Sequence, residues 1–178
     1  MKKTVAVLLL AFVVFACKQK EEAKPQPSLP GGPIQSLPGK TLGEEKLLRE
    51  VLTKDPKNLN AWVQLGNMMM DSARFNEAVD AYAKVLELDP KNVDVRVDMG
   101  TCLRNAGKPD LAIKEYKKAT EINPNHAYAH INLGVVLAND KKDYKAAVSE
   151  LEKGLSLNPN VPNAQAIRQE IQRLKTLK

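Results

Sequence analysis

The stretch that decides the fold is residues 59–92, which read LNAWVQLGNMMMDSARFNEAVDAYAKVLELDPKN. Its first half places Trp62, Leu65 and Met69 at i, i+3 and i+7, and residues 78–86 repeat this kind of spacing. Such spacing puts apolar side chains on one face of a helix. Turn residues lie between the two halves, and Pro90 stops the second one. The stretch therefore predicts two helices joined by a short turn.

The same unit recurs along the chain at a fixed period. Prolines follow one another at spacings of 34, 34 and 35 residues, at Pro56, Pro90, Pro124 and Pro159. Aligning on them gives units 59–92, 93–126 and 127–160, with one extra residue in the Asn139–Asp143 turn. Units of this length cannot bury an apolar face alone and must stack on their neighbours.

Three glycines occur in phase inside helical patterns, at Gly66, Gly100 and Gly134. Each costs about 1 kcal/mol relative to alanine in a helix. Their recurrence predicts that another helix lies against the backbone at these points. The small partners expected on the second helices are Ala78, Ala112 and Ala147.

The unit resembles the tetratricopeptide repeat, whose pattern is W–L–G–Y–A–F–A–P at positions 4, 7, 8, 11, 20, 24, 27 and 32. Residues 59–92 match six of the eight positions by type. The resemblance covers 59–160 and implies an all-α fold, a right-handed α-solenoid of three helix pairs. A partial repeat helix is expected in 43–58 and a capping helix in 161–178.

The first 16 residues have the features of a signal peptide, a cationic start followed by an apolar run too short to span a bilayer. The run ends in Val14-Phe15-Ala16-Cys17, which resembles the bacterial lipobox. That resemblance implies cleavage before Cys17 and acylation of this cysteine, which would anchor the protein in the cell envelope, facing the periplasm. Lys18 follows the cysteine where an aspartate would retain it at the inner membrane, so the outer membrane is favoured. The alternative is an ordinary signal peptide, or an uncleaved anchor, with an incidental cysteine.

A tether is expected at 17–42, because prolines and glycines crowd it: Pro25, Pro27, Pro30, Gly31, Gly32, Pro33, Pro38 and Gly39. Gly39-Lys40-Thr41 has the ending of a phosphate-binding loop, but Ile34 stands where the motif needs its first glycine. We therefore expect no nucleotide site.

Charge gives little reason to expect a nucleic-acid partner. Of the formal net charge of +6, two units belong to Lys2 and Lys3 and two more to residues 18–40, which leaves +2 for the rest. A nucleic-acid binder needs a concentrated basic patch. We expect neither nucleic acid nor a cofactor as a ligand.

Few residues could carry chemistry. His126 and His130 are four residues apart, a spacing that can hold a metal, but no third ligand is near in sequence. We interpret them as ordinary, partly exposed histidines. Cys102 is expected to be a packed residue rather than a nucleophile. The sequence predicts no enzyme and no metal site.

The resemblance implies that a protein segment binds in a groove lined by the first helix of each repeat. The implied groove residues are Asn60, Val63, Asn67, Met70 and Asp71, then Asp94, Val97, Asp98, Thr101, Arg104 and Asn105, and then Tyr128, Ile131, Val135, Ala138 and Asn139. Position 5 is β-branched each time, which predicts an apolar stripe. The carboxylate clamp of chaperone-binding members is not matched, because only Asn67 fits it.

These features favour a membrane-anchored adaptor that holds a segment of a partner protein, with apolar anchors and basic character in that segment. The resemblance leaves open whether pilus assembly, secretion or cytochrome maturation is served. The alternative from another class is an accessory subunit of an envelope enzyme complex, or a binder of a small molecule or metal. The sequence does not indicate an oligomeric state.

Overall fold

The computed structural model describes residues 40–177, which belong to one compact unit, Ile34–Lys178. The predicted signal peptide, Cys17 and most of the predicted tether lie outside the described residues. Within these residues every regular element is helical, and no helix is both long and apolar enough to cross a membrane.

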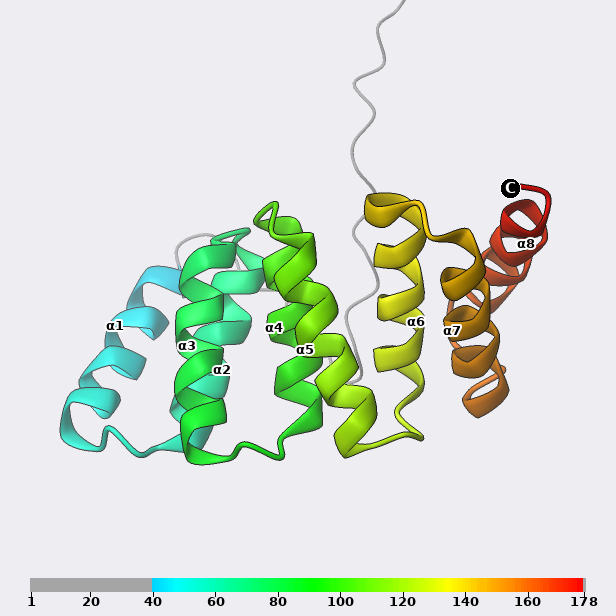
Figure 1. Ribbon diagram of the computed structural model, residues 1–178. Coiled ribbons are helices and arrows are strands. Elements are labelled where there is room, and N and C mark those ends of the chain that lie inside the picture. Colours follow the sequence, from blue (N-terminus) through cyan, green and yellow to red (C-terminus); the bar gives the residue numbers. More distant parts are fainter. Residues whose placement is uncertain (1–39, 178) are drawn as a thin grey trace, which may run out of the picture. The chain divides into compact units, whose positions relative to one another are not determined.

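The helices follow one another along the unit in chain order (Figure 1). Their bounds are α1 Lys40–Lys54, α2 Leu59–Asp71, α3 Phe75–Leu88, α4 Val93–Asn105, α5 Pro109–Ile122, α6 Ala127–Val136, the π-helical turn η1 Leu137–Lys141, α7 Tyr144–Leu157 and α8 Ala164–Lys175.

Three helix pairs form the three predicted repeats: α2 with α3, α4 with α5, and α6 with α7. Each second helix also packs against the first helix of the next pair, and α8 packs against α7. The predicted all-α, right-handed solenoid is confirmed. α1 packs against α2 in the place of a second helix, and it begins at Lys40, inside the range 17–42 that was expected to be tether. Pro38 and Gly39 are the last strong helix breakers, so the sequence permits a helix from the next residue.

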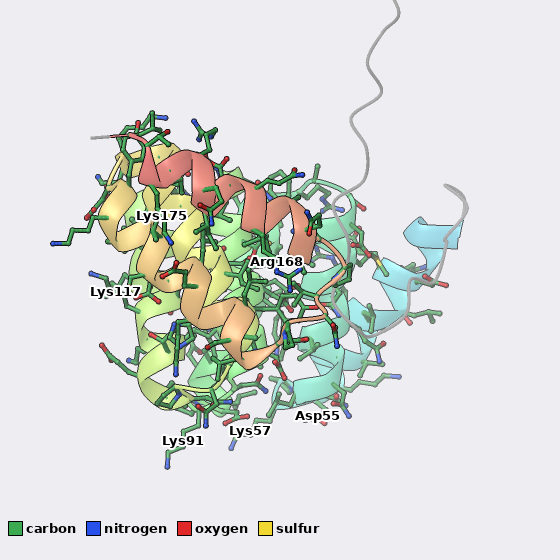
Figure 2. The ribbon with its side chains drawn as sticks, turned by 90° about the vertical axis from the view of Figure 1, so that its right-hand side faces the viewer. Asp55, Lys57, Lys91, Lys117, Arg168 and Lys175 are labelled. Carbon is green, nitrogen blue, oxygen red and sulfur yellow. The ribbon has the colours of Figure 1, made fainter. Side chains whose placement is uncertain are left out.

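The turn between successive repeats has the same construction each time. The first helices begin at equivalent N-cap residues, Asn58, Asn92 and His126, each of which accepts a hydrogen bond from the backbone N–H three residues on. Side chains of two such turns, labelled in Figure 2, lie at the same end of the helices, opposite Lys175. His126 is thus a helix cap, a role that its sequence context did not reveal.

The three helical glycines mark close approaches between the two helices of a repeat, as predicted. The nearest atoms belong to the side chain at position 24, and at Gly134 the backbone oxygen of the expected Ala147 also lies 3.0 Å from an added Cβ. A Cβ added at Gly100 would lie 2.6 Å from Cε1 of Tyr116, and one at Gly134 would lie 2.7 Å from Cγ of Leu151. The alanines Ala78, Ala112 and Ala147 are also fully buried, and they leave room for these large side chains.

The extra residue of the third repeat is absorbed by η1, a π-helical turn that extends α6. The chain then turns at Lys142, whose φ of 59° is left-handed. Ala73 and Gly107 occupy the equivalent positions of the first two repeats and are left-handed as well. The insertion therefore lengthens the first helix of the pair and keeps the same turn after it.

Candidate functional site

A row of side chains runs along one face of the first helix of each repeat. The row takes positions 2, 6, 9 and 13, whose spacing of i, i+4, i+7 and i+11 defines one helix face. We call these residues the groove row. They are all exposed or half-buried: Asn60, Gln64, Asn67 and Asp71 on α2, Asp94, Asp98, Thr101 and Asn105 on α4, and Tyr128, Asn132, Val135 and Asn139 on α6.

Ten of the predicted groove residues lie in this row. Val63, Met70 and Arg104 lie beside it, half-buried. Val97, Ile131 and Ala138 are buried, with 0%, 4% and 3% of their surface exposed, so the expected apolar stripe at position 5 is core and not surface in the last two repeats. The physical reason is that position 5 of α4 and α6 packs into the clusters formed with α5 and α7.

Gln64 and Asn132 belong to the row but were missed. Both are polar residues at position 6, one helical turn after position 2. Because Gln64 lies between Asn60 and Asn67 at helical spacing, the prediction of those two residues could have identified it. The sequence alone gave no such prediction for either residue.

Position 9 of the row changes from polar to apolar along the solenoid. The Tyr82 hydroxyl donates to Asn67 Oδ1 over 2.7 Å, and the Tyr116 and Thr101 hydroxyls lie 3.1 Å apart. These are the same two positions, 24 and 9, in successive repeats. In the third repeat they hold Leu151 and Val135, which carry no polar group. At position 9 the first two repeats therefore offer a hydrogen-bonding side chain, and the third offers a hydrocarbon one.

A cavity of about 190 Å³ lies at the apolar end of the row. It is bounded by α6, η1, α7 and α8, and its lining is Val135, Ala138, Asn139, Leu151, Ala166, Ile167 and Glu170. Ligand pockets for small molecules are usually about 300–1,000 Å³. This cavity is smaller, which suits a single aliphatic side chain.

The middle of the row is acidic. Burial, together with the nearby carboxylates Asp94 and Asp71, raises the pKa of Asp98 to about 7. Arg104, the cation beside the row, is already paired with Asp140 on η1 through a 2.8 Å contact. The face thus combines amide groups, the half-buried carboxyl of Asp98 and an apolar cavity at its end. It has the groups to bind a segment of chain.

The two histidines do not share a ligand position. His126 faces Asp94, with Nε2 2.9 Å from Oδ1, whereas His130 contacts Glu150 and the Pro124 carbonyl. His130 is buried and not partly exposed as expected. Its ring extends from α6 and contacts Glu150 of α7 and the turn before α6. Among residues 40–177 no three His, Cys, Asp or Glu side chains are grouped as a metal site would need.

Cys102 of α4 is fully buried in the core cluster that α4 shares with the first repeat. Burial, together with the Asp98 and Asp71 carboxylates, raises the pKa of its thiol to about 12. A thiol with so high a pKa holds almost no thiolate at neutral pH. The structure thus places Cys102 as a packed residue.

Comparison with solved structures places the fold among known solenoids. A structure described as MamA matches with a TM-score of 0.67 at 23% identity, covering 76% of this chain and 85% of the other. The Arabidopsis OM64 TPR domain matches with a TM-score of 0.61 at 18% identity, covering 65% and 94%. The first TPR of Spaghetti (RPAP3), bound to the HSP90 peptide SRMEEVD, matches with a TM-score of 0.62 at 20% identity, covering 68% and 96%.

No curated protein matches this sequence. The family model described as tetratricopeptide repeat matches residues 69–133 and 103–171, which together span more than half of the chain. The repeat period, the paired helices and this match agree, and the chain belongs to the tetratricopeptide repeat family.

Proposed function

We propose that this protein is a membrane-anchored adaptor of the bacterial cell envelope whose groove row holds a segment of a partner protein. The observation that carries the proposal is the groove row itself, with polar side chains in two repeats and an apolar cavity at its end. The structure of a related fold with an HSP90 peptide supports a peptide as the kind of ligand.

The side chains of the groove row determine which partner segment would be complementary to it. The backbone of this segment would exchange hydrogen bonds with the amides at Asn67 and Asn105, and one aliphatic side chain would enter the cavity at Val135. A basic residue would fit opposite Asp94 and Asp98, where ion pairing would compensate the desolvation of the half-buried Asp98 carboxyl. This segment differs from an acidic chaperone tail.

The groove is tested by photocrosslinking in cells from single introduced positions. A crosslinker at Asn105 or Asn139, both exposed in the row, should capture one dominant protein. A matched crosslinker at Lys117, exposed on α5, should not capture it. Equal capture from Lys117 and Asn105 would contradict a specific groove.

The anchor rests on the lipobox resemblance of Val14–Cys17, and we place the protein at the outer membrane because Lys18 follows the cysteine. Two or more acyl chains give stable anchoring, whereas one is marginal. Labelling with a fatty-acid analogue should mark the wild type and not Cys17→Ala, and membrane fractionation should then find the wild type in the outer membrane. Equal labelling of both proteins would remove the anchor from the proposal while leaving the groove intact.

A further inference from the structure

The helix α1 takes the place of a second helix in a repeat that has no first helix. It aligns with α3 at the 34-residue period, and it packs on α2 as each later second helix packs on the next pair (Figure 1). A first helix for α1 would fall at residues 25–37, which read PQPSLPGGPIQSL. This stretch has four prolines and two glycines, a composition that predicts no helix. The sequence therefore gives α1 no first helix of its own.

Two positions on each second helix lie against the first helix of the same repeat. One position holds Ala81, Glu115 and Glu150, and the other holds Val85, Ala119 and Gly154. Glu115 of α5 pairs with Arg96 of α4, and a Cβ added at Gly154 of α7 would lie 2.5 Å from Cγ1 of Ile131 on α6. Ala81, Val85 and Ala119 are at most 3% exposed. These two positions are therefore covered in every complete repeat.

The same two positions hold aliphatic residues in α1. Leu47 and Val51 occupy them, and the part of the chain that the structure describes leaves 62% and 41% of their surface exposed. Leu48 is only half-buried, whereas Tyr82 and Tyr116 at the equivalent position are fully buried. The side of α1 that a first helix would cover is thus an apolar face with no helix on it.

The other end of the stack is built differently. There α8 packs against α7 and buries Ile167, Ile171 and Leu174, while its outer face is polar. A polar outer face on the terminal helix is what keeps a solenoid soluble as a single copy. Of the two terminal helices of the described unit, only α1 leaves two neighbouring aliphatic side chains exposed, one helical turn apart.

The face of α1 also carries opposite charges at its two ends. Glu44 lies one helical turn before Leu47, and Lys54 lies one turn after Val51. Glu44 stands at the position where the complete repeats have Ala78, Ala112 and Ala147. A helix packed on this face would bury the Glu44 carboxylate, which is costly unless a cation pairs with it. The occupant of the face must therefore bring a positive charge to the Glu44 end.

We propose that α1 of a second copy of this chain occupies the face, antiparallel to the first, so that each copy supplies the first helix that the other lacks. A two-fold axis makes such a contact identical for both copies. When Leu47 of one copy lies level with Val51 of the other, Glu44 lies level with the other copy's Lys54. A parallel arrangement would instead bring like charges together. This inference does not depend on the groove row or the anchor.

The size of the contact sets its strength. Stable interfaces bury about 800 Å² on each partner, and one helix from each copy offers less than this. We therefore expect a weak dimer that forms at about 100 µM protein and dissociates on dilution to about 1 µM.

The first test is disulfide formation between two differently tagged copies of the full chain that are expressed together. Copies with Glu44→Cys and Lys54→Cys should crosslink to each other under mild oxidation, because these positions lie level in the antiparallel contact. Two copies that both carry Glu44→Cys should crosslink far less. Copies with Lys117→Cys, exposed on α5, measure random collision.

Three results of the crosslinking would overturn the proposal. A yield for the Glu44→Cys and Lys54→Cys pair no higher than that of Lys117→Cys would show that the helices do not meet. Preferential crosslinking of Glu44→Cys to itself would show a parallel contact. A crosslink from these positions to a different protein, in place of the second copy, would show that the face belongs to another partner.

The second test measures the mass of the purified full chain in mild detergent by sedimentation at increasing concentration. Leu47→Asp should abolish the dimer, and Leu111→Asp, which changes another exposed leucine on α5, should leave it intact. Glu44→Lys should raise the dimer Kd about tenfold, because attractive pairs become repulsive, and adding Lys54→Glu should restore it. A wild type that stays monomeric at about 100 µM, or equal effects of Leu47→Asp and Leu111→Asp, would refute the proposal.

Discussion

At the scale of single residues, the fold depends on contacts that leave no room for a methyl group. Gly100 on α4 faces the ring of Tyr116 on α5, and that ring is 1% exposed. The Tyr116 hydroxyl is also bonded to Thr101. The ring therefore has little freedom to move aside, and burial raises the pKa of its hydroxyl to about 12.

Gly100→Ala should destabilise the protein despite the better helix propensity of alanine. The propensity gain is about 1 kcal/mol and overpacking costs about 1–3 kcal/mol. Because the Tyr116 ring has little freedom to move aside, we expect the overpacking cost to exceed the gain, with a net loss of up to about 2 kcal/mol in the free energy of unfolding. The control is Gly43→Ala on α1, where an added Cβ meets nothing within 4 Å. Urea unfolding of both variants measures the difference, and a stabilised Gly100→Ala would contradict the close contact.

Asp98 should make stability depend on pH. Its pKa is raised to about 7 from an ordinary 3.8, mainly by burial. The folded state therefore binds a proton that the unfolded state has released, so stability is fully present below about pH 3.8 and falls as pH rises towards 7. Asp98→Asn should flatten this part of the curve of Tm against pH. An unchanged slope between pH 4 and pH 7 would show that Asp98 is not responsible.

At the scale of helices and turns, each helix pair is joined by a turn with one left-handed residue. Ala73, Gly107 and Lys142 have φ values of 56°, 76° and 59°. Only the second is glycine, the residue that tolerates this conformation without steric cost. Packing of the helix pairs thus determines the turn geometry, and Ala73 and Lys142 adopt the left-handed conformation despite its steric cost.

Gly107→Ala should cost about 1–2 kcal/mol in the free energy of unfolding, the usual penalty for an L-residue in this conformation. No atom lies within 4 Å of the added Cβ, so the backbone alone would account for the loss. Ala73→Gly, at the equivalent turn, should not show a loss of that size. Thermal or urea unfolding compares the two, and equal effects of the same sign would contradict the argument.

The helix pairs could be predicted from sequence because proline, glycine and apolar residues recur at a fixed period. The boundaries at the irregular points could not be predicted. The extra residue of the third repeat continues α6 as a π-helical turn, and the conformation of this turn depends on its packing against α7. Ten of the residues predicted from the resemblance lie in the groove row. Val97 and Ile131 were misplaced, because the surface or core position of a helix face is decided by neighbouring helices that one sequence pattern does not locate.

At the scale of the whole described unit, ion pairs and a capping helix join and close the stack. Arg74 of the first repeat pairs with Glu45 of α1, Lys141 pairs with Asp110 of the repeat before it, and Lys175 of α8 pairs with Glu152 of α7. α8 buries Ile167, Ile171 and Leu174 and leaves its other face polar. It also supplies Ala166 and Ile167 to the cavity. The capping helix therefore forms one side of the cavity and also closes the fold.

The affinity of the captured partner segment for matched variants of α8 tests the groove most directly. Ala166 is exposed and lines the cavity, while its neighbour Gln165 lines a separate depression on the other side of α8. Burial of one aliphatic side chain contributes about 1.5–3 kcal/mol, so filling the cavity with Ala166→Trp should raise the Kd at least about tenfold. Gln165→Trp should leave the Kd unchanged, with equal melting temperatures showing that both variants are folded. An unchanged Kd for Ala166→Trp, or an equal loss in both variants, would contradict a partner that anchors in this cavity.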